Sequence, residues 1–209
     1  MNIEDAIAQG NVLQVESIIK QKLDKTPCDV ELWIKLCLTE LQFPLEDYVS
    51  ALKCIAKIYT IACDNIDTLI LETAIKWHNT GYIDTELFDR LCNADCKNNQ
   101  KMAVIYYLQS LYHHSKNDTG HEKAALEKSI YLCGDFVYPY ISLGCILLAD
   151  SSAQKGSELI EKAVKNVQKV FQADEKLDFT NIDFYISEFV TGTTLSKSNF
   201  DYILRLAEN

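Results

Sequence analysis

Three histidines that lie close together in the sequence are the residues best suited to bind a metal ion. His113 and His114 are adjacent, and His121 follows seven residues after His114. Imidazole nitrogen is a good ligand for zinc, copper and nickel. Adjacent residues on a helix point about 100° apart, however, so His113 and His114 cannot both face one ion unless a loop intervenes. Ordinary surface or half-buried histidines are the better interpretation, and we expect no metal site here.

A second possible metal site is the pair Cys92 and Cys96, which are four residues apart and would share one face of a helix. Thiolates at this spacing can hold zinc, but a structural zinc site needs four ligands. No second pair of cysteines, and no Cys-His pair, stands at a matching spacing. We therefore predict that the chain binds no metal and no other cofactor, and zinc binding is kept only as a remote alternative.

The sequence also lacks the patterns that mark catalytic sites. It has no glycine-rich phosphate loop, no Gly-x-Ser-x-Gly turn and no His-Glu-x-x-His motif. The neighbouring carboxylates Glu46 and Asp47 fall where a helix is expected to begin, and acidic side chains there interact favourably with the helix dipole. His78 follows Trp77, a pair better suited to a groove wall than to general-base catalysis. We predict no catalytic residues and no enzymatic activity.

The elements that must carry these side chains are indicated by two series of small residues with a common period. Members of the first series are 37, 36 and 34 residues apart, and those of the second are 36, 37 and 34 apart. Interlocked series of one period are typical of a repeated helical hairpin, because helices that cross closely need a small side chain at the crossing. The first series is Cys37, Ala74, Ser110 and Gly144, and the second is Ala56, Cys92, Ser129 and Ala163.

The repeats predict an all-α protein built from antiparallel helical hairpins, stacked as a short right-handed α-solenoid. The expected hairpins span about 30–63, 67–93, 100–133 and 138–171, and a partial repeat occupies 1–24 of this 1–171 array. After residue 171 the period is lost, and two short amphipathic segments follow at about 181–190 and 197–207. Because solenoids need a terminal element with one polar face, we predict that 172–209 forms a pair of capping helices in the same domain. Docking of this segment on a partner is the alternative.

Composition agrees with a helical protein and narrows the class of partner. Seven glycines and three prolines in 209 residues are too few for the many tight turns of an all-β protein. The formal net charge is −10, and a field of this sign repels the phosphates of nucleic acids and of anionic lipids. We therefore expect a protein partner, no nucleic acid and no membrane contact.

The N-terminus and the cysteines predict a cytoplasmic protein. Met1 is followed by Asn-Ile-Glu-Asp, which lacks the basic and then apolar pattern of a signal peptide. No apolar run approaches the roughly 18 residues of a membrane span. Most of the eight cysteines fall on the expected apolar faces of helices, where a free thiol packs as a small hydrophobic group. We expect reduced, buried thiols rather than disulfides.

The last expected hairpin carries a recognisable motif. A bulky residue, a Leu-Gly pair, an aliphatic residue, a small residue and a late alanine follow one another there in a fixed order. These positions are Tyr140, Leu143, Gly144, Leu147, Gly156, Ile160 and Ala163. In this motif the segment resembles one tetratricopeptide repeat, and with its weaker copies the resemblance extends over about residues 30–170.

In the tetratricopeptide family the first helices of successive hairpins line a concave groove that binds peptides or folded partners. Carried over by position, the resemblance implies a partner-binding face made of Leu41, Leu71, His78, Tyr107, His114, Tyr138 and Leu148. This face is apolar and aromatic, and Lys35 is the nearest cation. Members that grip acidic peptide tails use lysine, arginine and asparagine there. The resemblance therefore implies a basic partner, or one with an exposed apolar helix.

These observations predict a non-enzymatic protein–protein interaction module that binds one protein partner stoichiometrically. A compact acidic adaptor of this kind would suit a dedicated chaperone, which cradles an extended apolar segment. It would equally suit an immunity protein, which covers the positive site of a basic toxin. The alternative is a scaffolding subunit of a larger assembly, and the sequence leaves these roles open.

Overall fold

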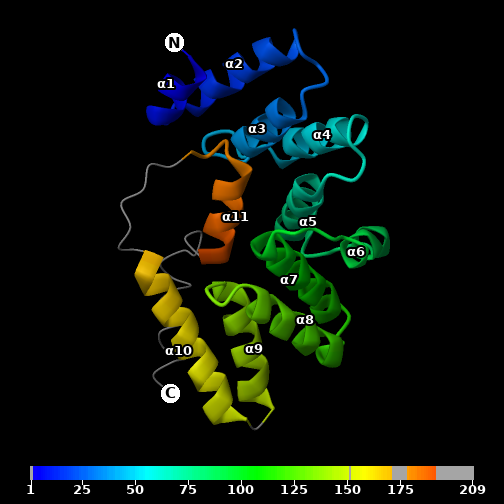
Figure 1. Ribbon diagram of the computed structural model, residues 1–209, viewed down its shortest axis with the longest axis vertical. Coiled ribbons are helices and arrows are strands. Elements are labelled where there is room, and N and C mark those ends of the chain that lie inside the picture. The colour runs from blue at the N-terminus through cyan, green and yellow to red at the C-terminus, as the bar shows by residue number, and fades with distance from the viewer. Residues whose placement is uncertain (1, 151, 171–177, 192–209) are drawn as a thin grey trace. The chain divides into compact units, whose positions relative to one another are not determined.

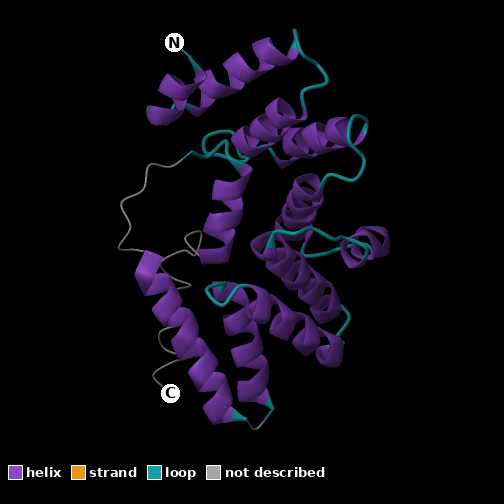
Figure 2. Ribbon diagram, in the orientation of Figure 1, coloured by secondary structure: helices purple, strands orange, loops and turns teal. Residues whose placement is uncertain are grey.

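The computed structural model describes residues 2–150, 152–170 and 178–191, with side chains omitted at 168–170. Within these residues the chain forms eleven α-helices and no β-strand (Figures 1 and 2). The predicted all-α class, built from stacked helical hairpins, is confirmed. The second capping segment at 197–207 and most of the connector before 181 lie outside the described residues.

Contacts divide the chain into two compact units. Among the described residues, unit 1 comprises 2–81 and 178–185, and unit 2 comprises 82–150, 152–170 and 186–191. The single domain expected from the sequence stays a prediction.

Unit 1 is built around the hairpin of α3 and α4. Its helices are α1 (Ile3–Ala8), α2 (Val12–Leu23), α3 (Val30–Glu40), α4 (Tyr48–Tyr59) and α5 (Ile66–Thr80). Helix α2 packs on α3, and α5 packs on α4. The core between them holds Ile19, Leu38 and Ile58, all fully buried. Helix α1, which the repeat pattern does not indicate, forms because Asn2 and Asp5 cap it reciprocally.

Unit 2 stacks two longer hairpins behind a short helix. Its helices are α6 (Thr85–Cys92), α7 (Asn99–Ser115), α8 (Thr119–Leu132), α9 (Val137–Ala149) and α10 (Ala153–Val170). Helices α7 and α8 form one hairpin, α9 and α10 form the next, and α8 packs on α9. The last described helix is α11 (Ile182–Thr191), whose residues up to 185 belong to unit 1 and whose later residues belong to unit 2.

Helix starts are fixed locally by asparagine and aspartate. Each of α1 to α8 is preceded by one of these residues, whose side-chain oxygen accepts a hydrogen bond from a backbone N–H of the first turn. Asp84, for example, accepts from the N–H of Leu87 at 2.8 Å. Such a cap satisfies a donor that the helix itself cannot pair. The expected hairpins therefore begin within about one residue of α3, α5, α7 and α9, the first helices of the observed ones.

The two series of small residues have different outcomes. All four members of the first series are buried. In the second series Ser129 and Ala163 are buried, but Ala56 and Cys92 are exposed. The prediction for those two was wrong because the connections before α4 and α6 have seven and four residues, whereas the connection before α8 has three. Positions that follow the first series by 18 or 19 residues therefore fall on different faces of the second helix in different hairpins.

The crossing of α9 and α10 depends on two glycines. A Cβ at Gly144 would lie 2.7 Å from the Ile160 side chain and 3.1 Å from the Gly156 carbonyl oxygen. A Cβ at Gly156 would lie 2.8 Å from the Gly144 carbonyl oxygen and 2.9 Å from the backbone nitrogen of Leu148. The two backbones thus approach more closely than any larger residue would permit.

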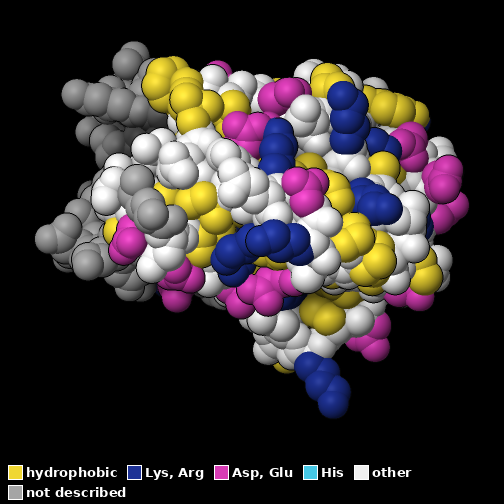
Figure 3. All heavy atoms as spheres, turned by 90° about the horizontal axis from the view of Figure 1, so that it is seen from above, with side chains coloured by type: hydrophobic (Ala, Val, Ile, Leu, Met, Phe, Trp, Pro, Cys, Tyr) yellow, Lys and Arg dark blue, Asp and Glu magenta, His cyan; other side chains and the backbone are white. Residues whose placement is uncertain are grey.

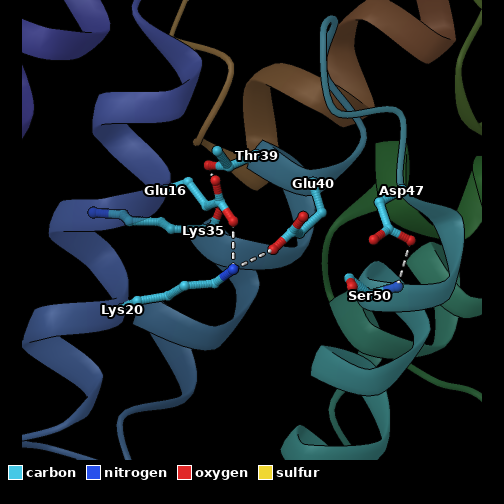
Figure 4. A network of polar contacts seen from close by, with 7 residues as sticks. All are labelled: Glu16, Lys20, Lys35, Thr39, Glu40, Asp47 and Ser50. Carbon is cyan, nitrogen blue, oxygen red and sulfur yellow. Dashed lines mark hydrogen bonds and ion pairs between the residues drawn. The ribbon is translucent and has the colours of Figure 1, made fainter.

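A buried carboxylate ties α2 to α3 in unit 1 (Figure 4). Lys20 of α2 places its Nζ 3.2 Å from Glu40 Oε1 and also forms an ion pair with Glu16. Glu40 is only 3% exposed. Burial raises the pKa of the Glu40 carboxyl above its ordinary value, and Lys20 offsets part of that rise. The ion pair with Lys20 therefore offsets only part of the free-energy cost of burying the Glu40 carboxylate.

Candidate protein-binding face

Unit 2 carries a cluster of aromatic rings on the side of α7 and at the start of α9. We call Tyr107, Phe136 and Tyr138 the aromatic face. The Tyr107 ring lies 5.2 Å from Phe136 and 5.9 Å from Tyr138, measured between centroids. Spacings of this size suit favourable stacked and edge-to-face contacts.

The aromatic face is occupied by the second half of α11. The Phe189 ring lies 5.9 Å from Tyr107, 5.9 Å from Phe136 and 5.6 Å from Tyr138. Phe189 is 8% exposed and Tyr107 is 9% exposed. Burial raises the pKa of the Tyr107 hydroxyl above its ordinary value. The four rings therefore form one aromatic cluster, in which a phenylalanine from an amphipathic helix packs against the aromatic face.

The core of unit 1 is covered by Phe179 and by the first turn of α11. Phe179, Ile182 and Tyr185 pack against the buried cluster that includes Leu71 and Ile75. Leu71 is fully buried in that cluster. The described part of the segment expected to cap the array therefore packs on helices to which we had assigned partner-binding residues, and its capping role stays a prediction. The sequence indicated an amphipathic segment at about 181–190, but it did not indicate which helices this segment contacts.

Of the seven residues expected to line the partner-binding face, three lie in unit 1 and four lie in unit 2. Leu71 and Tyr107 are buried, His78 and His114 are exposed, and Leu41, Tyr138 and Leu148 are half-buried. Of these, the structure brings Tyr107 and Tyr138 into contact. Leu41 packs on the core of unit 1, and Leu148 packs on the α10 residues Ile160 and Val164. The role of the seven in binding stays a prediction.

Sequence reasoning missed Phe136 and Phe189, which complete the aromatic cluster. Phe136 precedes the expected last hairpin, and it is the N-cap of α9 with no side-chain hydrogen bond. Phe189 lies in the amphipathic segment, three residues after Ile186 on the same apolar stripe. That stripe was the available signal, but its spacing alone does not say which helix it will contact.

A cavity of about 510 Å³ in unit 1 has an acidic lining. Its walls come from the starts of α3 and α5 and from residues 178–183. The lining includes the carboxylates of Glu31, Asp67, Asp178 and Asp183, and the cation Lys35. Lys35 is paired with Glu31, at 2.9 Å between Nζ and Oε1. The charge balance of this cavity suits a cationic group better than an anionic one.

Charge on the surface is otherwise mixed where it can be seen. Figure 3 shows a face on which lysine and arginine side chains lie beside aspartate and glutamate, with hydrophobic side chains between them. None of the helices within the described residues is long and apolar enough to cross a lipid bilayer. The eight cysteines are all free, and only Cys37 and Cys54 are buried. Burial raises the pKa of the Cys54 thiol to about 12.

Known proteins resemble this chain in fold only. No protein-family model matches the chain, and no curated protein matches it. A crystal structure of MamA has a TM-score of 0.64 and 19% sequence identity over 83% of this chain and 99% of that one. The chain shares the fold of MamA. Residues 41 to the end of MamA from Desulfovibrio magneticus RS-1 give a TM-score of 0.61, with 15% identity over 83% of this chain and 93% of that one.

The likeness to MamA supports the description of the fold as an all-α arrangement of stacked helical hairpins. At such identities the likeness extends to the arrangement of helices and not to a binding site. The likeness therefore says nothing about the aromatic face or the acidic cavity.

Proposed function

We propose that this chain is a non-enzymatic protein-interaction module and that the aromatic face of unit 2 is its principal docking site. The observation that carries the proposal is that this face already receives a helix, since Phe189 of α11 fills the pocket formed by Tyr107, Phe136 and Tyr138. A pocket that accepts an amphipathic helix of its own chain has the shape and polarity to accept one from another protein.

The partner helix would take the place of the second half of α11. Its anchor would be an aromatic or large aliphatic side chain, because the pocket is lined by rings and offers its occupant little water. Helix α11 would then act as a competitor that lowers the apparent affinity of the partner.

The charge of the chain suggests a basic protein. The net charge of −10 and the acidic cavity of unit 1 both favour positively charged surfaces, and they would speed the encounter with them. This partner would suit the chaperone and immunity roles, in which one copy of the chain covers one copy of its target. In the scaffolding role the same face would bind a neighbouring subunit. The cytoplasmic location stays a prediction.

The test is capture of partners from native lysate at low and high salt, with proteins quantified by mass spectrometry. Wild-type chain is compared with Tyr138→Ala, which alters the aromatic face, and with Tyr131→Ala, whose side chain is 89% exposed on α8. We expect one basic protein in a one-to-one ratio, retained by Tyr131→Ala, reduced with Tyr138→Ala and reduced by salt. Equal capture by both variants would exclude the aromatic face as the docking site.

A further inference from the structure

Three side chains with metal-binding atoms converge where α7 ends and α8 begins. Oδ2 of Asp118 lies 2.7 Å from Nδ1 of His121 and 3.6 Å from Nδ1 of His113. One possible ligand atom from each residue lies within 4.8 Å of the other two. The His113 and His121 rings stack, with centroids 5.2 Å apart and planes inclined by 21°.

The turn between the helices explains why these residues meet. Lys116, Asn117 and Asp118 form the connection, and Asn117 has the left-handed φ of 56° that reverses the chain. Asp118 caps α8, accepting a hydrogen bond from the His121 N–H at 3.3 Å through Oδ1. The sequence argued against a metal site because the adjacent residues His113 and His114 point in different directions on a helix. In the structure the companions of His113 are the two residues across the turn.

His113 is the anchored member of the cluster. Its side chain is 18% exposed, and its ring packs edge-on against Phe88 at 5.1 Å. Asp118 and His121 are more open, at 41% and 74%. An ion could therefore reach the cluster from solvent, and His121 could adjust its ring without disturbing the core. The nearby Lys116 lies over the rings of Tyr82 and Tyr112, each at 5.4 Å.

We propose that His113, Asp118 and His121 bind a divalent transition-metal ion such as zinc. Zinc takes imidazole and carboxylate ligands at about 2.0–2.1 Å, which places the ligand atoms of a tetrahedral site about 3.3 Å apart. The distances of 2.7 and 3.6 Å from Oδ2 to the two imidazole nitrogens bracket that spacing. Three protein ligands leave the fourth position to water or to a side chain of another protein.

A neighbouring pair gives a matched control. His114 Nδ1 lies 3.0 Å from Glu122 Oε1, so this histidine is engaged with a different carboxylate. His114→Ala removes an imidazole from the same turn without touching the proposed ligands. Asp118→Asn removes the carboxylate charge and keeps a side chain that caps helices well. His121→Ala alters a side chain that is 74% exposed and is therefore not needed for folding.

The experiment is a titration of the purified full chain, with any affinity tag removed, using Co²⁺ followed by absorption and Zn²⁺ followed by calorimetry. Cobalt bound to thiolate gives a sulfur charge-transfer band, whereas cobalt bound to nitrogen and oxygen does not. This separates the proposed site from the eight cysteines. We expect one equivalent of cobalt without the sulfur band.

Zinc affinity should fall about tenfold or more in Asp118→Asn and in His121→Ala, because each loses one of three ligands. It should be unchanged in His114→Ala. Absence of binding, a sulfur band at the first equivalent, or equal affinity in all four proteins would overturn the proposal. Circular dichroism of each variant shows that the comparison is made on folded chains.

Discussion

At the scale of single residues, the most consequential group in unit 1 is the buried carboxylate of Glu40. Its pKa is raised chiefly by burial, so the folded chain resists ionising it although Lys20 lies 3.2 Å away. Below the ordinary pKa of glutamate the group is protonated in both the folded and the unfolded chain and costs nothing. As the pH rises, ionisation is easier in the unfolded chain, and stability is lost up to the folded-state pKa.

Glu40→Gln removes this loss while keeping a side-chain oxygen that can accept from Lys20. We expect the free energy of unfolding of the variant, relative to wild type, to increase as the pH is raised from about 4 to about 7. Urea unfolding at a series of pH values measures the difference. A difference that decreases with pH would show that the ion pair with Lys20 outweighs the cost of burial.

Replacing glycine by alanine should have opposite effects on the free energy of unfolding at two positions, Gly156 and Gly120. Gly156→Ala would place a Cβ against the backbone of α9, which cannot move aside, so we expect a loss of about 1–3 kcal/mol. Gly120→Ala, in the first turn of α8, meets only Asp118 Oδ1 at 3.9 Å. It should be neutral or stabilise by up to about 1 kcal/mol, because alanine loses less backbone entropy in a helix. Thermal unfolding of both variants tests the pair, and equal effects would contradict the close crossing of α9 and α10.

At the scale of helices, Phe189 is one of three buried side chains in the second half of α11, with Ile186 and Val190. The Phe189 side chain is 8% exposed and contacts three aromatic rings of unit 2. Phe189→Ala should lower the free energy of unfolding of unit 2 by about 3–5 kcal/mol, the usual cost of removing a buried phenylalanine. Phe184→Ala, at a half-buried position of the same helix, is the control and should cost less. Denaturant unfolding of both variants gives the comparison, and equal costs would mean that the aromatic pocket does not hold α11.

The helices themselves could be predicted from sequence because their signals are local. Asparagine or aspartate caps, turn residues and apolar stripes all act within a few residues, and they define α2 to α11 in the sequence. Helix α1 was missed because its six residues, Ile3–Ala8, are too few for an apolar period to be recognised. The exposed positions of Ala56 and Cys92 could not be foreseen, since they depend on how each connection rotates the following helix.

The candidate sites depend on contacts between distant segments, and sequence was a weaker guide there. Tyr107 and Tyr138 were selected by repeat position, and they do meet. Nothing in the repeat indicates that Phe189, about 50 residues further along the chain, will cover them, because an apolar stripe does not specify its partner. The same holds for His113, whose companions across the turn depend on the left-handed conformation of Asn117.

At the scale of the whole molecule, the proposed function rests on helical hairpins with apolar faces and on the acidic net charge of the chain. The described part of the chain provides an aromatic pocket that binds a helix and a cavity lined by carboxylates. A single partner could present both an amphipathic helix and a basic surface. If α11 competes with that partner, variants on the two sides of the pocket must change affinity in opposite directions.

The most direct test is the affinity of the captured partner, purified, for wild type, Phe189→Ala and Tyr138→Ala, measured by calorimetry at fixed salt. Phe189→Ala weakens the competitor, so the partner should bind it about threefold or more tightly than wild type. Tyr138→Ala removes part of the pocket, so binding should weaken by about tenfold, the equivalent of about 1.4 kcal/mol. If both variants bind the partner as wild type does, the aromatic face is not the docking site.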